Sequence, residues 1–187
     1  PLLADPLRMF DSCLISDGGA AYITTSIQRA RDLPQPPVVV AGVGEGSSAS
    51  GIHWSQQRDF TSTPQVFAAA PAFEMAGVAP DDVDVLTVYD PFTVVSMMQI
   101  EDMGFCDKGE AGGFVEGVTL HHDAGKLAFN THGGLLSHAY VLGIAHVVEV
   151  VKQLRGTAAA QVTGCEVGVY GGYTGGMAST LVLRRDR

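Results

Sequence analysis

A hairpin pattern near the end of the chain limits the possible folds more than any other feature. Val162–Tyr170 and Met177–Arg184 are rich in β-branched and aliphatic residues, and Gly171–Gly176 between them supplies a turn. In the preceding stretch, His138–Leu154, apolar residues recur at helical spacing, and Gly156 provides a stop. A helix followed by a strand hairpin indicates a layered α/β fold.

Other helix and strand patterns alternate along the rest of the chain. Strands are predicted at Gly18–Thr25, Val38–Gly42 and Val83–Val88, and helices at Ser26–Leu33, Pro64–Met75 and Phe92–Met103. Two segments are too rich in glycine or serine for regular structure and are predicted to be loops: Gly44–Gly51 and Gly104–Gly117.

The charge of the chain argues against a nucleic-acid partner. The net charge is −9, and the basic residues cluster only at the end, in Arg184–Arg187. No apolar run approaches the roughly 20 residues that span a bilayer, and the first residues do not resemble a signal peptide. We expect a soluble, cytoplasmic protein without membrane contact. The start at Pro1 in place of methionine suggests a processed or truncated product.

Cysteine and histidine spacing predicts neither a disulfide framework nor a metal site. The cysteines are odd in number and widely separated, which favours reduced thiols in packed positions: Cys13, Cys106 and Cys165. His121-His122 and His132 show no regular ligand spacing with any cysteine, and Asp123 alone does not complete a ligand set. These side chains are interpreted as turn or surface residues.

Several motifs in order along the chain carry a family resemblance. Residues 12–21 (Ser-Cys-Leu-Ile-Ser-Asp-Gly-Gly-Ala-Ala), 130–134 (Asn-Thr-His-Gly-Gly), 135–143 (Leu-Leu-Ser-His-Ala-Tyr-Val-Leu-Gly) and 153–156 (Gln-Leu-Arg-Gly) resemble segments of the thiolase superfamily, particularly thiolases of the sterol-carrier-protein type and their lipid-transfer-like relatives. The resemblance implies the C-terminal half of that fold, with a mixed sheet packed by helices. It also implies that residues 1–78 close the N-terminal half and its connecting loops, and that residues 79–187 form the C-terminal domain.

The residues that differ from the thiolase pattern are those at its active-site positions. The histidine of the family's His-Pro-x-Gly motif falls on Tyr140, and the asparagine of its Asn-Glu-Ala-Phe motif falls on Tyr89. In thiolases these two residues form an oxyanion hole. The catalytic cysteine of the last loop is also absent, because Tyr170 and Gly171 occupy that region and Cys165 lies upstream. Thiolase chemistry is therefore the less favoured interpretation.

Tyrosines at these two positions resemble those of thiolase-like aldolases of bacterial steroid side-chain degradation. The resemblance implies cleavage of a β-hydroxyacyl-CoA into a ketone and a shorter acyl-CoA, such as propionyl-CoA. A phenol can donate and accept a hydrogen bond, and its usual pKa is about 10. If Tyr140 begins the helix predicted at His138–Leu154, the helix dipole would favour its phenolate. We therefore expect Tyr89 and Tyr140 to share the acid and base roles, with coenzyme A present only as part of the substrate.

A second set of residues is a candidate for lining the substrate site: Gly133, Gly134, His138, Tyr170, Gly171 and Gly172. Each also has a structural interpretation, because glycines permit tight turns, tyrosines pack with the hydroxyl at the surface, and His138 can simply start a helix. Three carboxylates near the motifs are expected to be solvated or ion-paired: Asp90, Glu110 and Glu116.

Partners and alternatives follow from the same resemblance. It implies a homodimer, an acyl-CoA substrate with an apolar group such as a steroid, and a small partner protein with an OB-fold and a zinc ribbon. Two other functions remain open. A divergent acyl-CoA thiolase would need a reactive cysteine elsewhere, and a non-catalytic lipid-transfer or scaffold protein would bind without turnover.

Overall fold

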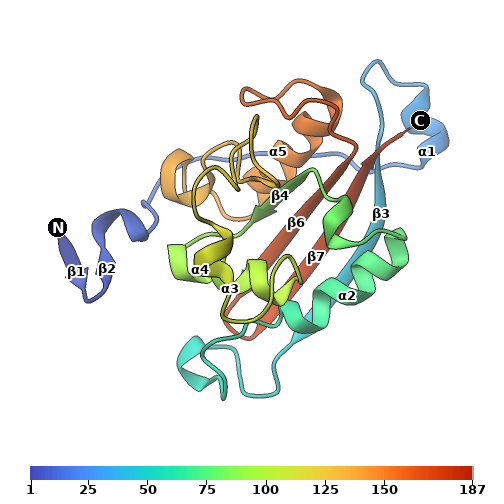
Figure 1. The fold of residues 1–187 in the computed structure, drawn as a ribbon. Helices are drawn as coiled ribbons and strands as arrows, with labels where there is room; N and C mark the ends of the chain where they lie inside the picture. Colours follow the sequence, from blue (N-terminus) through green and yellow to red (C-terminus); the bar gives the residue numbers. More distant parts are fainter. Residues whose placement is uncertain (187) are drawn as a thin grey trace.

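A computed structural model describes residues 1–186 and is built around one five-stranded mixed sheet (Figure 1). The strand order is β3-β7-β6-β4-β5, with bounds Val38–Ser47 (β3), Val85–Val88 (β4), Ala128–Phe129 (β5), Val167–Thr174 (β6) and Met177–Arg185 (β7). The β3–β7 and β6–β7 pairs are antiparallel, and β4 is parallel to both β5 and β6. The expected mixed α/β sheet is confirmed, and Arg187 of the predicted basic cluster lies outside the described residues.

Helices cover the sheet, and their bounds are Ile27–Arg31 (α1), Gln65–Ala76 (α2), Thr93–Asp102 (α3), Ala111–Phe114 (α4) and Ile144–Arg155 (α5). Short 3₁₀ turns occur at Met9–Asp11, Trp54–Gln56 and Pro80–Asp82, and a π-helical turn at Gly134–His138. A small hairpin of β1 (Leu2–Ala4) and β2 (Leu7–Arg8) protrudes from the body near the N-terminus (Figure 1). Within residues 1–186, every helix is too short or too polar to cross a bilayer.

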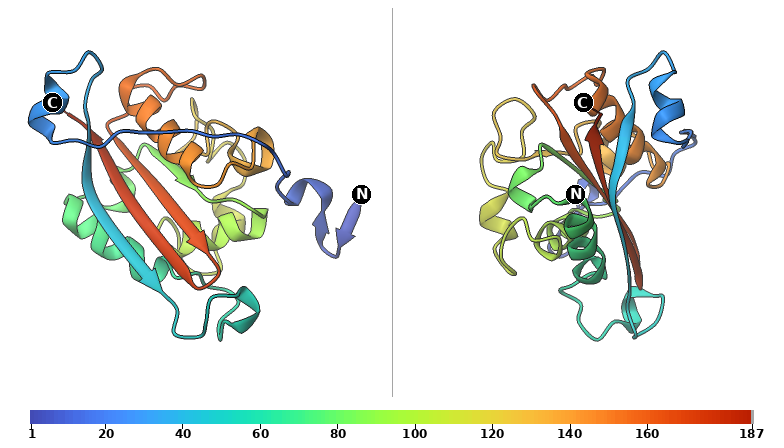
Figure 2. Two further views of the ribbon diagram at one scale, coloured as in Figure 1. Left: turned by 180° about the vertical axis from the view of Figure 1, so that it is seen from behind. Right: turned by 90° about the vertical axis from the view of Figure 1, so that its right-hand side faces the viewer.

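Two apolar clusters lie on opposite faces of the sheet, because successive strand side chains alternate in direction. On β4, Leu86 and Val88 pack with the cluster beneath α2, whereas Val85 packs with the cluster beneath α5. Val150 of α5 reaches Gly168 of β6, where an added Cβ would lie 2.4 Å from its Cγ1. Figure 2 shows α2 and α5 on either side of the sheet when it is viewed edge-on.

The glycines of β3 explain why this strand extends beyond the predicted end at Gly42 and into the predicted loop. They alternate along the strand and all face α2. A Cβ on Gly44 would lie 1.9 Å from the carbonyl oxygen of Ala68. A Cβ on Gly42 or Gly46 would likewise lie 2.0 or 2.2 Å from a carbonyl oxygen of α2 or of the residue that caps it. The missing Cβ atoms allow the α2 backbone to rest directly on β3. The glycine repeat is therefore a close-packing surface.

The strand expected at Gly18–Thr25 is wrong. This segment runs across the molecule without regular structure, and Ile23 is 93% exposed. A β-strand needs a neighbour for its backbone hydrogen bonds, and this segment pairs with no strand among residues 1–186. The following helix matches its prediction, because the Ser26 Oγ accepts a hydrogen bond from the Arg29 N–H at 3.4 Å and caps α1.

The longest predicted helix begins later than its apolar pattern indicated. Helix α5 starts at Ile144, so the predicted place of Tyr140 at its N-terminus is also wrong. Leu142 adopts a φ angle of 60°, which belongs to the left-handed region and cannot continue a right-handed helix. Tyr140 consequently lies in the irregular connection between the π-helical turn and α5.

The division predicted at residue 78 stays a prediction. Strand β3 and helix α2 precede this boundary, yet β3 pairs with β7 along its length and α2 packs on the same sheet. The elements on both sides of residue 78 therefore share one hydrophobic core.

Candidate functional site

The two predicted tyrosines meet at one point of the structure. The hydroxyl oxygens of Tyr89 and Tyr140 lie 2.5 Å apart, and either can be the hydrogen-bond donor. Their rings meet edge to face, with centroids 6.2 Å apart and planes inclined by 64°. Two residues from distant parts of the sequence thus present one shared pair of hydroxyl groups.

Tyr89 is held by its backbone at the end of β4. Its N–H donates to the carbonyl oxygen of Gly171 at 2.8 Å, and its own carbonyl accepts from Gln99 Nε2 at 2.8 Å. The preceding residue, Val88, is clamped by Asn130, whose Oδ1 accepts from the Val88 N–H at 2.9 Å and whose Nδ2 donates to the Val88 carbonyl at 3.2 Å. The tyrosine therefore projects from a fixed strand end.

The surroundings of Tyr89 and Tyr170 favour the neutral forms of these two side chains. Burial raises the pKa of Tyr89 far above its usual value, and the hydrogen bond with Tyr140 raises it further. Burial also raises the pKa of Tyr170 to about 12. Tyr89 is thus protonated at neutral pH and suited to donating a proton or a hydrogen bond.

A cleft of about 540 Å³ opens beside Tyr89. Its walls come from the end of β3, the facing parts of β6 and β7, and the start of the connection into α5: Glu45, Gly46, Ser47, Leu142, Gly143, Tyr170, Gly172, Tyr173, Thr174, Met177, Ala178 and Ser179. Gly171 of β6 faces Gln65 of α2, so the side chain of Tyr170 points to the other face of the sheet. The volume is in the range of small-molecule sites.

The predicted substrate residues divide into two groups. Tyr170 and Gly172 line the cleft with Tyr89, and the hydroxyl of Tyr170 packs so closely on Gly143 that a Cβ there would lie 1.8 Å away. The other four lie elsewhere: Gly171 faces α2, Gly133 and Gly134 form the start of the π-helical turn, and His138 ends that turn in an exposed position. Their binding roles stay predictions.

A buried polar cluster lies beneath the tyrosines. Asp90 is 2% exposed, and its Oδ1 accepts from the Leu135 N–H at 2.8 Å and contacts His146 Nε2 at 3.0 Å. The expectation of a solvated Asp90 is therefore wrong, whereas an ion-paired role is consistent with His146. The His132 ring packs edge-on against His146 at 4.8 Å, and burial lowers the pKa of His132 to about 3.

His146 was missed in the sequence. It lies on the buried side of α5 together with two further polar residues, Glu149 and Gln153. Polar side chains on the inward face of an amphipathic helix were the available signal, since a buried polar group needs a partner.

The described cysteines are poorly suited to act as nucleophiles, because their thiols are held in the protonated form. Cys165 is fully buried, and burial raises its pKa to about 12. Burial also raises the pKa of the half-buried Cys13 and Cys106. Within residues 1–186, no cysteine lines the cleft.

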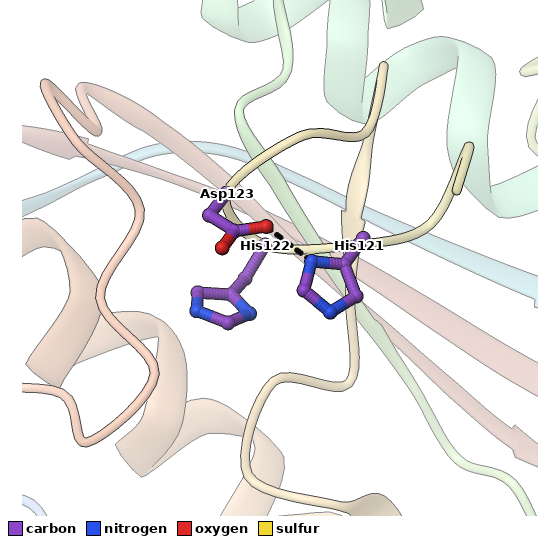
Figure 3. A group of neighbouring side chains, drawn as sticks. All are labelled: His121, His122 and Asp123. Atoms are coloured by element: carbon purple, nitrogen blue, oxygen red, sulfur yellow. Dashed lines mark hydrogen bonds and ion pairs between the residues drawn. The ribbon is translucent and has the colours of Figure 1, made fainter.

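One group of side chains has a composition suited to a metal ion. His121, His122 and Asp123 offer ligand atoms that all lie within 4.8 Å of one another in the loop before β5 (Figure 3). His121 Nδ1 already forms a hydrogen bond with Asp123 Oδ1, and both side chains are more than half exposed. A divalent ion would have to displace this hydrogen bond, and none of the three residues lines the cleft.

Comparison with known proteins identifies the family. Residues 46–185 match the model of the thiolase C-terminal domain-like family. The chain belongs to this family. A solved structure described as an Ltp2-ChsH2 aldolase superposes on the whole of this thiolase-like chain with a TM-score of 0.93 at 33% identity, and the match covers 50% of that structure's chain.

The relatives of this thiolase-like chain are named for two kinds of reaction: carbon–carbon cleavage and acyl transfer. A 17-hydroxy-3-oxo-4-pregnene-20-carboxyl-CoA lyase of Mycobacterium tuberculosis is 36% identical over 97% of this chain and 47% of its own length. A steroid side-chain-cleaving aldolase of Thermomonospora curvata is 34% identical over 99% of this chain and 48% of its own length. An acetyl-CoA acetyltransferase of Methanothermobacter thermautotrophicus is 39% identical over 98% of this chain and 49% of its own length. The chain thus spans about half the length of these relatives.

Proposed function

We propose that the complete protein is a thiolase-fold retro-aldolase, a carbon–carbon lyase that cleaves a β-hydroxyacyl-CoA into a ketone and a shorter acyl-CoA such as propionyl-CoA. The observation that carries the proposal is the contact between the Tyr89 and Tyr140 hydroxyls at 2.5 Å beside the cleft. The acyl group of the β-hydroxyacyl-CoA substrate would be a steroid side chain, as the names of the lyase and aldolase relatives suggest.

The proposed reaction is balanced within the tyrosine pair. One phenol oxygen takes the proton of the β-hydroxyl group while the Cα–Cβ bond breaks and its electrons form the enolate of the thioester. The other phenol gives its proton to the α-carbon of that enolate. Because the two hydroxyls are hydrogen-bonded, the first phenol can pass its own proton to the second, and no free phenolate has to accumulate. The raised pKa of Tyr89 is consistent with such a relay.

A divergent acyl-CoA thiolase is the second candidate, favoured by the identity to the acetyl-CoA acetyltransferase. That reaction would need a nucleophilic cysteine, and the buried, high-pKa thiol of Cys165 is poorly suited to the role. The two functions differ in a measurable intermediate, because a thiolase forms an acyl-enzyme and a retro-aldolase does not.

The test is to incubate the complete protein with a β-hydroxyacyl-CoA and to follow ketone and acyl-CoA by mass spectrometry. We expect both products, an unacylated enzyme, and a rate at least about 100-fold lower in Tyr89→Phe and in Tyr140→Phe. Tyr22→Phe is the matched control, because this tyrosine is 51% exposed and does not line the cleft. Full cleavage rates in both single variants would refute the proposal, an acylated cysteine would support the thiolase, and binding without products would support lipid transfer.

The proposed assembly follows the same relatives. We propose that the complete protein forms a homodimer and binds a small partner with an OB-fold and a zinc ribbon. The description of the Ltp2-ChsH2 aldolase names two components and so supports a partner protein. Coenzyme A would enter only as part of the substrate. Size-exclusion chromatography with light scattering, with and without the co-expressed partner, measures both expectations.

A further inference from the structure

We propose that Asp90 is a positioning residue that fixes Tyr140 against Tyr89. The inference rests on the proposed function, because it concerns the same pair of hydroxyls, and it adds a residue that does not itself touch the substrate. Asp90 directly follows Tyr89 at the end of β4, and its carboxylate is directed into the protein, where it is 2% exposed.

The carboxylate of Asp90 holds both sides of the segment that carries Tyr140. Its Oδ1 accepts a hydrogen bond from the Leu135 N–H, in the π-helical turn that precedes Tyr140, at 2.8 Å. The same oxygen lies 3.0 Å from Nε2 of His146, in the first part of α5 that follows Tyr140. One side chain adjacent to Tyr89 thus anchors the chain before and after its partner tyrosine.

Gly134 allows this close approach. Its φ is 61°, and a Cβ at this position would lie 2.1 Å from Oδ2 of Asp90. The turn and the carboxylate therefore meet at a distance that only glycine permits. The contact with Asp90 also explains why position 134 is a glycine, which the sequence alone indicates only as a turn residue.

The state of His146 is consistent with a structural bond to Asp90. Because Nε2 faces the carboxylate, this nitrogen carries the proton and donates it. The other ring nitrogen, Nδ1, is buried and has no hydrogen-bond partner among residues 1–186. Burying the His146 imidazole with one nitrogen unpaired costs free energy. The hydrogen bond to Asp90 offsets part of that cost.

Tyr140 depends on these anchors more than Tyr89 does. Tyr89 is fixed by backbone bonds to Gly171 and by Gln99, independently of Asp90. Tyr140 lies in a connection without regular structure, where the neighbouring Leu142 has a left-handed φ of 60°. Loss of the Asp90 bonds should therefore move Tyr140 and leave Tyr89 in place.

The test compares Asp90→Ala and Asp90→Asn in the complete protein. Alanine removes the acceptor, whereas asparagine keeps an Oδ1 that can accept from both donors. We expect kcat of Asp90→Ala to fall about 10- to 100-fold with KM changed less than about threefold, because small misplacements of catalytic groups have effects of this size. Asp90→Asn should restore most of the rate. If Asp90→Ala does not fold, His146→Leu serves as the test variant in its place, because it removes one of the two donors to Asp90.

A second readout does not depend on activity. The phenols are labelled at Cζ with ¹³C and their chemical shifts are recorded by NMR at neutral pH. Asp90→Ala should change the Cζ shifts of Tyr89 and Tyr140, whose hydroxyls are hydrogen-bonded to each other, but not that of Tyr173. Asp84 is the matched control, because its carboxylate accepts the N–H groups of Glu166 and Val167 at the opposite end of β4. Asp84→Ala should lower stability and leave kcat and the Cζ shifts of both phenols unchanged.

The outcomes separate this inference from the proposed function. A folded Asp90→Ala with unchanged kcat and unchanged Cζ shifts of both phenols overturns the positioning role. A loss of kcat without any change in these shifts also overturns it, because Asp90 would then act by another route. If Tyr89→Phe and Tyr140→Phe cleave at full rate while Asp90→Ala still alters the Cζ shifts, the proposed function fails and the positioning role stands.

Discussion

Removing the side chain of Asn130 should weaken the sheet and the tyrosine pair together. Strand β5 pairs with β4 only at Val85 and Leu86, so its backbone ends before it reaches Val88. The amide of Asn130 continues the ladder, accepting from the Val88 N–H and donating to the Val88 carbonyl. Val88 is fully buried and directly precedes Tyr89, so both of its backbone groups depend on this one side chain.

The expected effect follows from the two groups that lose their partner. A buried backbone donor or acceptor left unpaired costs about 1–3 kcal/mol, so Asn130→Gly should lower the free energy of unfolding by at least about 2 kcal/mol. Asn130 also has a φ of 40°, in the left-handed region that asparagine and glycine tolerate. Asn130→Ala should therefore have a free energy of unfolding roughly 1 kcal/mol lower than that of Asn130→Gly, because alanine is strained at this φ.

The measurement is urea unfolding of the complete protein followed by circular dichroism, together with kcat for the cleavage reaction. Comparing the glycine and alanine variants separates lost hydrogen bonds from backbone strain, since both lack the amide and only alanine is strained at positive φ. We expect kcat to fall in both variants. The free energy of unfolding of Asn130→Gly could instead lie within about 0.5 kcal/mol of that of the unsubstituted protein, as for a neutral surface substitution. Water would then replace the amide, and the prediction that Asn130 stabilises the sheet would be wrong.

Three further predictions concern packing and pH. Gly44→Ala should lower Tm by roughly 2–12 °C, because its Cβ would lie 1.9 Å from a carbonyl oxygen of α2 and overpacking costs about 1–3 kcal/mol; Gly19→Ala, with open space around it, should not change Tm. Gly143→Ala should displace the Tyr170 hydroxyl, raising KM more than it destabilises the fold, as steady-state kinetics and thermal unfolding would show. Because the pKa of His132 is lowered from 6.5 to about 3, the unfolded chain binds an additional proton between these values. The free energy of unfolding should therefore decrease as pH falls from 6.5 to about 3. Urea unfolding at several pH values in this window should show a weaker pH dependence of this free energy for His132→Phe.

The sequence predicted the elements whose signals are local. Helix α2 and helix α3 lie within the segments predicted to be helical or end one residue beyond them, and α1 begins directly after Ser26, the residue expected to cap it. Strand β3 was placed correctly at its start but predicted too short, because glycine is usually a turn signal. Its alternation at every second position could have indicated a strand face in contact with another backbone. The start of α5 depended on the backbone angle at Leu142, which apolar periodicity does not report.

The sequence could indicate the two tyrosines of the candidate site, whose catalytic roles stay predictions, but not the contacts that support them. The family resemblance selected Tyr89 and Tyr140 from two distant segments, and the structure brings their hydroxyls together. It could not select His146, whose importance comes from a carboxylate on another element. Hydrogen bonds between residues far apart in sequence leave no local pattern, so the sequence left Asp90 either solvated or ion-paired, and only the structure shows that it is buried against His146.

The contact between the tyrosines changes how the departure from the thiolase pattern is understood. Taken singly, tyrosine in place of histidine and tyrosine in place of asparagine are two losses from an oxyanion hole. At 2.5 Å the hydroxyls form one unit, in which ionisation of either phenol changes the proton affinity of the other. Such a unit can accept one proton and release another without a change in its total charge. A retro-aldol reaction needs this balance, because it removes a proton from oxygen and adds one to carbon. The two substitutions therefore make chemical sense as a pair, and Asp90 links the segments that bring the pair together.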